Sequence, residues 1–327
     1  MFNGSFLFYQ NLDKLKCIDL RRSENLIQTP NFKGVPILEK LFLSWCSNLV
    51  EVHPSLGKLR RLFILELEHC HSLINLPRMT TKMESLTTLR LCGCSKFRKV
   101  PEFEGILKSL SELDLSGTAI EKLPSSIECL TALTVLDLRN CENIERLPNN
   151  MDGLRSLEKL VLSGCSQIVE LPENLWKINC LKELDLSRIG LRWPIEKMFS
   201  NGRLSSLKYL TLSYTECVTL PASISQLLKL ETLDLCYCKQ LQSLPELPPT
   251  VRYINAKACY SLESSTALLK ISTSLQPPSL FGCQHDESKG EVAFRLLNHY
   301  LQVLSVSVSL LIFCFDNLIV WGRGFQA

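Results

Sequence analysis

The sequence predicts an α/β repeat fold, a solenoid in which one short unit recurs along most of the chain. Three observations predict it. The phrase LxxLxL recurs at nearly constant spacing, its apolar residues alternate with polar ones, and a Leu-Pro pair follows most copies. A fixed period of about 20 to 50 residues is typical of repeat architectures, in which each unit buries its apolar face against its neighbours. We therefore expect one elongated body without a single central core.

The recurring phrase defines the unit. The step between units is 23 to 24 residues until the late units, where it grows to 26 and then shortens to 21. A Leu pattern of this kind, followed by a Cys or Thr, is that of leucine-rich repeats. The sequence thus predicts a leucine-rich repeat array of about 11 units over residues 15–263, after a partial N-terminal edge at residues 1–14. The first Leu of each unit, or the Val that replaces it, lies at positions 15, 38, 62, 86, 110, 133, 157, 181, 207, 230 and 251.

Each unit should begin with a short strand, because alternating apolar residues indicate a strand with one buried face. Successive units run in the same direction, so the strands should be parallel and should line the concave face of a curved horseshoe. Proline lacks an amide donor, so a pair such as Leu123-Pro124 predicts a turn into an irregular or short helical return on the convex face. In that return, Ile127 and Leu130 should reach the core.

The repeat pattern ends near residue 263, and two further segments follow. Residues 264–300 are interpreted as a post-repeat linker with a short helix from about Gly290 to Tyr300. Residues 301–327 form an aberrant apolar tail, which we interpret as the product of a truncated gene model or of a read into non-coding sequence. The apolar run from Val303 to Phe315 is shorter than the roughly 18 residues that a membrane-spanning helix needs. A membrane partner is therefore not expected.

Composition limits the classes of partner and the compartment. The 36 Lys and Arg residues exceed the 33 Asp and Glu residues by only three, which gives no electrostatic footprint for nucleic acid. The cysteine count of 15 is odd, and many cysteines recur at one place in the unit, so we expect buried free thiols rather than disulfides. Free thiols and the lack of a secretion signal favour a cytoplasmic or nucleocytoplasmic location. This cysteine column consists of Cys46, Cys70, Cys94, Cys141, Cys165, Cys238 and Cys259.

No catalytic constellation is found. The sequence lacks the phosphate-binding G-x-x-x-x-G-K-[ST], the dinucleotide-binding G-x-G-x-x-G, and the H-E-x-x-H and G-x-S-x-G motifs of hydrolases. We therefore expect no catalytic residue, no cofactor and no metal, and an enzyme would need a site that the sequence does not show. Cys92 with Cys94, and Cys236 with Cys238, are weak metal candidates, because the first of each pair should face out and the second in.

The candidate recognition surface is the set of positions that point out of the concave face. Acidic residues dominate the outward position that follows the central residue of each strand. Two interpretations stay open for them: a solvated consensus position, or a site for a cation or a basic peptide. Five basic residues should offset their repulsion: Lys40, Arg139, Lys159, Lys182 and Arg188.

Aromatic residues on this face collect at its two ends, and exposed Tyr and Trp are common anchors of protein interfaces. The regular stretch from Leu110 to Ser187 should carry less of the specificity than the irregular units on either side. The predicted protein-binding residues are Phe42, Trp45, Phe63, Arg90, Asp114, Asp137, Arg139, Asp185, Tyr209, Tyr214, Asp234, Tyr237 and Tyr253.

The phrases LVEVHPSLG, GTAIEKLPSSI and LSGC carry a family resemblance. Over residues 11–262 the chain resembles the leucine-rich repeat region of TIR-NBS-LRR disease resistance proteins, the intracellular immune receptors of plants. The resemblance implies a non-catalytic recognition and autoinhibition region. Its partners would be a pathogen effector or a guarded host protein and, in a full-length parent, the receptor's own nucleotide-binding domain. That domain, and a TIR domain able to consume NAD, would lie upstream of Met1. The alternative is a free-standing scaffold or decoy that binds another protein.

Overall fold

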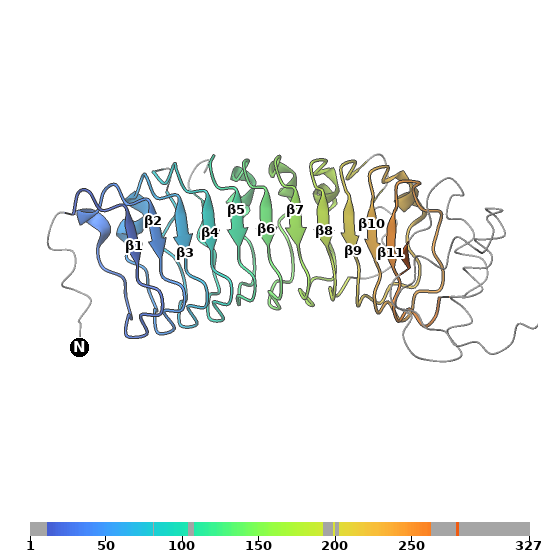
Figure 1. The fold of residues 1–327 in the computed structure, drawn as a ribbon, viewed down its shortest axis with the longest axis horizontal. Coiled ribbons are helices and arrows are strands. Elements are labelled where there is room, and N and C mark those ends of the chain that lie inside the picture. Colours follow the sequence, from blue (N-terminus) through green and yellow to red (C-terminus); the bar gives the residue numbers. More distant parts are fainter. Residues whose placement is uncertain are drawn as a thin grey trace, which may run out of the picture.

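The computed structural model of the chain describes residues 12–80, 82–103, 108–191, 199, 203–262 and 279–280. It is a curved solenoid with one parallel sheet, whose strand order follows the chain (Figure 1). The strands are β1 Cys17–Asp19, β2 Lys40–Phe42, β3 Ile64–Glu66, β4 Thr88–Arg90, β5 Glu112–Asp114, β6 Val135–Asp137, β7 Lys159–Val161, β8 Glu183–Asp185, β9 Tyr209–Thr211, β10 Thr232–Asp234, β11 Tyr253–Asn255 and β12 Ser279–Leu280.

The repeat phrase sets the position of the strands. From β1 to β11, each strand begins two residues after the first Leu or Val of its unit, as Glu112 follows Leu110. The middle residue points inward and is buried, while its two neighbours face outward. Pairing keeps Leu89, Leu113 and Leu136 in register, so the middle residues stack into one continuous core. The predicted repeat period is therefore confirmed for all of these units.

The cysteine column joins each unit to the one before it. The thiol of Cys141 donates to the carbonyl of Leu115 at 3.1 Å, and that of Cys165 donates to Leu138 at 3.1 Å. Where Thr118 replaces the Cys, its hydroxyl donates to the carbonyl of Leu115 at 2.7 Å. A small apolar group with one donor suits this position, because it fills the turn and satisfies a buried carbonyl. All seven thiols make this contact, so the predicted structural role is confirmed.

The return segments contain short 3-10 helices. Pro124 lies at the N-cap of η3, and its carbonyl accepts from the amide of Ile127 at 3.1 Å. Ile127 and Leu130 are fully buried, as predicted. The helices in the described residues are η1 Phe32–Gly34, η2 Pro54–Lys58, η3 Ser125–Cys129, η4 Met151–Gly153, η5 Glu173–Lys177 and η6 Ala222–Gln226.

Several predictions fall outside the described residues. They include most of the N-terminal edge at 1–14, the helix at 290–300, the apolar tail at 301–327 and part of the 26-residue step. Within the described part of the chain, no helix has the length and apolar character needed to cross a bilayer.

Candidate protein-binding face

The acidic positions of the concave face shape the turns that follow the strands. Asp114, at the end of β5, accepts from the amide of Ser116 at 2.9 Å and from its hydroxyl at 2.7 Å. Asp185 makes the same two contacts with Ser187. An Asp that caps the amide two residues ahead stabilises a tight turn. The other capping residues of this kind are Asp19, Asp137, Asp234 and Asn255.

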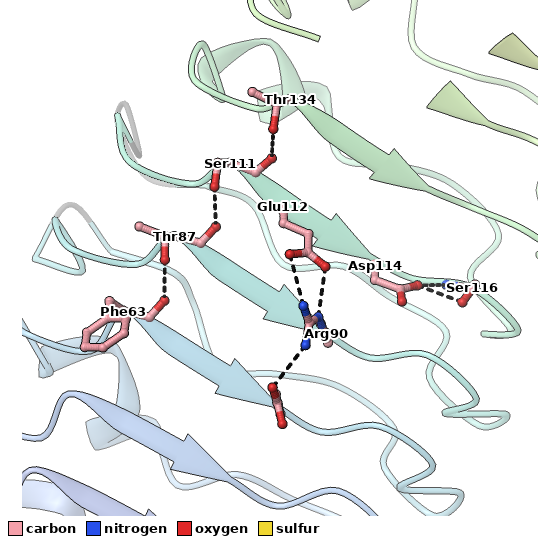
Figure 2. A network of polar contacts seen from close by, with 9 residues as sticks. Phe63, Thr87, Arg90, Ser111, Glu112, Asp114, Ser116 and Thr134 are labelled. Carbon is pink, nitrogen blue, oxygen red and sulfur yellow. Dashed lines mark hydrogen bonds and ion pairs between the residues drawn. The ribbon is translucent and has the colours of Figure 1, made fainter. Parts of the chain in front are cut away.

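Arg90 ties three neighbouring strands together on this face. Its guanidinium donates to Glu112 on β5 at 2.8 Å, as Figure 2 shows, and to Glu66 on β3 at 3.1 Å. Both neighbours raise the pKa of Arg90, so it stays charged. The guanidinium of Arg90, a predicted protein-binding residue, is therefore already paired with carboxylates of this chain.

The basic residues offset the acidic positions less directly than the sequence suggested. Of the five predicted basic residues, all of which the structure describes, only Arg139 pairs with an Asp of the outward column, at 3.3 Å from Asp137. Lys159 and Lys182 pair with glutamates of neighbouring units at 2.6 and 2.7 Å. Lys40 and Arg188 lie over aromatic rings instead. The physical reason is spacing: strands stack at about 4.8 Å, so a long side chain reaches the same column of the next unit.

The centre of the face is crowded. Val161, which the sequence places in the outward column, is only 2% exposed. Burial raises the pKa of the neighbouring Asp137, although the amide and side chain of Arg139 act in the opposite direction. Asp137 and Val161 are paired in register on β6 and β7, so both findings describe the same crowded place on the face.

Two of the late aromatic residues stack together with an arginine. Tyr214, Tyr237 and Arg188 are here called the tyrosine stack. The rings of Tyr214 and Tyr237 lie parallel, with centroids 4.7 Å apart, and the guanidinium of Arg188 lies 4.4 Å above Tyr214. Tyr214 is 45% exposed. Tyr209 and Tyr253 begin strands β9 and β11 and are not part of this stack. Of the four predicted late tyrosines, Tyr214 and Tyr237 therefore stack on each other, together with an arginine.

The three early aromatic residues each have a different partner for their ring. Trp45 stacks on His69 with centroids 4.1 Å apart, and this pair is here called the tryptophan stack. Phe42 instead lies under the guanidinium of Arg21, and Phe63 under the ammonium of Lys40. Phe63 precedes its strand and Trp45 follows its own, so the two lie at opposite edges of the face.

Both stacks lie in one column that the sequence analysis missed. The residue just before the cysteine column, or before the residue in its place, has a positive φ, a conformation that only glycine adopts freely. The central units mostly use glycine there, while the outer units carry large side chains. The available signal was the glycine before Cys or Thr in CGC, SGT and SGC. The members of this positive-φ column are Arg22, Trp45, His69, Gly93, Gly117, Asn140, Gly164, Arg188, Tyr214, Tyr237 and Ala258.

Two central thiols of the cysteine column, those of Cys141 and Cys165, do not provide a reactive group. Burial raises the pKa of Cys141 to about 11 and that of Cys165 to about 12. Cys92 is partly exposed while Cys94 is buried, which confirms the predicted directions of that pair. Protonated thiols are poor nucleophiles and poor metal ligands. Across the described residues, no group of three or more His, Cys, Asp or Glu side chains is arranged to hold a metal ion.

The repeats are similar to those of several plant proteins. Residues 42–201 match a family described as a leucine-rich repeat region. The chain is 34% identical over 188 residues to the disease resistance protein RPS4 of Arabidopsis thaliana. This match covers 57% of this chain and 15% of that protein. It is 32% identical to the TMV resistance protein N of Nicotiana glutinosa, with 78% of this chain and 26% of that protein covered. The chain thus spans about a quarter or less of the length of these relatives.

Solved structures support the fold. The leucine-rich repeat domain of the type III effector XCV3220 (XopL) is 27% identical, with a TM-score of 0.51, and the match covers 72% of this chain and 74% of that chain. The functional domain of InlJ from Listeria monocytogenes, which includes a cysteine ladder, has a TM-score of 0.50 at 16% identity. That match covers 76% of this chain and 54% of that chain, and it supports the fold alone.

Proposed function

This chain is a leucine-rich repeat protein whose homologues are plant TIR-NBS-LRR disease resistance proteins, and we propose that it is the recognition region of such a receptor. In this proposal its concave face senses a pathogen effector or a guarded host protein in the cytoplasm or nucleus. The same region holds the nucleotide-binding domain of the receptor inactive. It performs no catalysis itself, and any NAD hydrolysis belongs to a TIR domain.

The tyrosine stack is the observation that carries the proposal. Tyr214 and Tyr237 both have a positive φ, which costs a residue with a side chain about 1 kcal/mol or more. Central units avoid that cost with Gly117 and Gly164 at the same position. Tyr214 remains 45% exposed, so burial in the core does not offset the cost. Strained, exposed aromatic residues of this kind are typical of binding sites, where a partner covers them.

A second function stays open on the same observation. A free-standing scaffold or decoy would use the same stack to bind another protein, without any signalling domain. Coding sequence for a TIR domain and a P-loop in the same transcript would favour the receptor.

The test is a quantitative pull-down from infected and uninfected plant tissue with the full chain as bait. Replacing Tyr214 and Tyr237 with Ala should reduce capture of the protein that the wild-type chain binds at least about tenfold, because two stacked anchors are lost. Thermal unfolding should change little, since Tyr214 is exposed and Tyr237 is only half-buried. The matched control is Leu228→Ala, an apolar residue that is 65% exposed after η6 and should not alter capture.

A second double variant separates folding from recognition. Glycine at 214 and 237 fits the positive φ without strain, so the variant should be at least as stable as the Ala variant and should bind equally poorly. Unchanged capture by either folded double variant would contradict the proposal.

A further inference from the structure

A cavity of about 420 Å³ lies near the N-terminal end of the concave face, beside strands β1 to β3. Its lining differs from the rest of the face, because it combines an exposed indole, an unusual serine and several charged groups. The lining residues are Asp19, Arg21, Arg22, Ser44, Trp45, Glu66 and Glu68.

Ser44 contributes a hydroxyl that has no partner. The side chain is 3% exposed, and its Oγ is one of two buried polar side-chain atoms in the described residues that make no hydrogen bond. The equivalent Ser116 and Ser187 bond to Asp114 and Asp185 at the end of their own strands. In the unit of Ser44 that Asp is replaced by Phe42. Buried polar groups are nearly always paired, so a free hydroxyl beside a cavity points to a missing partner.

Trp45 lines this cavity and is 47% exposed, although one side of its indole is already stacked. His69 covers one face of the Trp45 indole at 4.1 Å. In the tyrosine stack, the ring of Tyr214 is covered by Arg188 from the unit before it. The equivalent residue before Trp45 is Arg22, which lines the cavity and, among the described residues, makes no ring contact. A guanidinium therefore covers Tyr214 in the tyrosine stack, whereas the equivalent arginine does not cover Trp45 in the tryptophan stack.

The three carboxylates that line the cavity differ in whether they already have a partner within the chain. Both carboxylate oxygens of Asp19 are held by Arg21, the closer contact being 2.6 Å. Glu66 pairs with Arg90 at 3.1 Å. The Glu68 carboxylate has no hydrogen bond or ion pair among the described residues, and it is half-buried. One carboxylate thus remains for a cation that enters the cavity.

We propose that this cavity binds an arginine side chain of the protein partner, a step that rests on the function proposed above. The guanidinium stacks on the open face of Trp45 and donates to Glu68. It also donates to the Ser44 hydroxyl after rotation of that side chain. Arginine fits better than lysine, because a planar fork of donors can stack and form paired hydrogen bonds at once. Arg22 opposes entry as a like charge.

The test uses the full chain labelled with ¹⁵N and the small probe Nα-acetyl-L-arginine methylamide. The indole N–H signal of Trp45, assigned by its loss in Trp45→Phe, should shift saturably with a dissociation constant of about 1 mM or weaker. The citrulline analogue, which has the same shape without the charge, should produce no saturable shift.

Variants identify the binding groups. Glu68→Gln should weaken arginine binding at least about fivefold, and Arg22→Ala should strengthen it, because the competing charge is removed. The matched control is Glu216→Gln, at an exposed carboxylate near the tyrosine stack, which should leave binding unchanged. Equal shifts with citrulline, no shift with arginine, or full binding by folded Glu68→Gln would each overturn the cavity assignment. The loss of partner capture on replacing Tyr214 and Tyr237 would still stand in that case, so the two proposals fail separately.

Discussion

At the scale of single residues, one backbone position makes the same demand in every unit. The residue before the cysteine column must adopt a positive φ, and Gly93, Gly117 and Gly164 meet this demand at little steric cost. Gly164 has a further reason, because a Cβ there would overlap the Asn140 side chain. Most outer units place a larger side chain at the same position, such as Trp45, Tyr214 and Tyr237. The same backbone rule thus separates a glycine-rich centre from two ends with larger side chains, which are the ends proposed for recognition.

A residue-scale prediction concerns alkaline pH. Burial raises the pKa of Cys165 from 9.0 to about 12 in the folded chain. Below about pH 9 both states keep the proton, so the stabilising contribution of the protonated thiol is fully present. Above that pH the unfolded state loses its proton first, and stability falls until the folded pKa is reached. The free energy of unfolding, measured with urea, should therefore be flat from about pH 7 to 8.5 and fall from about pH 9 to 12.

Other thiols and amines also titrate in this range, so the informative quantity is a difference. Cys165→Val keeps the volume of the side chain, and its stability should fall less steeply with pH than that of the wild type. Equal slopes for the two proteins would contradict the assigned burial effect.

At the scale of elements, the strands could be predicted and the stacks could not. Alternation of apolar and polar residues identifies the inward-pointing residue at the middle of each strand. The middle residues of β1 to β11, from Ile18 in the first to Ile254 in the last, therefore follow from the repeat phrase. Trp45 and Phe42 are near in sequence, yet they lie in different columns, because a turn with positive φ separates them. Stacking is decided by the equivalent residue of the next unit, 24 positions on for Trp45 and His69. Val161 lies between Asp137 and Asp185 of the neighbouring units, so its burial cannot be read from its own unit.

An element-scale prediction decides between the two interpretations of the acidic column. Asp114 caps the turn after β5 through Oδ1. Asp114→Asn keeps that oxygen and removes the charge, while Asp114→Ala removes both. If the role is structural, Asn should leave the melting temperature nearly unchanged and Ala should cost about 1 kcal/mol of stability. Titration with a short polylysine peptide provides the second measurement. Clear binding by the wild type that is lost in a stable Asn variant would instead establish a basic-peptide site.

At the scale of the whole molecule, stability is shared only between neighbours. Each described strand pairs with the next along the chain, and the core runs through all units without a centre. In such an array the free energy is close to a sum of unit and interface contributions, and units with two neighbours resist opening better than units near an end. Trp45 follows β2 and Tyr237 follows β10, so both stacks lie in outer units. The residues proposed for recognition therefore lie in the parts that open more easily.

Amide hydrogen exchange should show this gradient directly. We expect the slowest exchange in strands β5 to β7 and faster exchange toward β1 and β11, because local opening needs fewer broken interfaces near an end. Leu136→Ala, at a fully buried position of β6, should cost about 2 to 5 kcal/mol and speed exchange in the units on both sides. Ile254→Ala in β11 should affect only nearby units. Uniform protection along the chain, or an equal global effect of both variants, would show a single cooperative core instead. The ends could then not open separately from the centre, and recognition at either stack would have to involve the whole array.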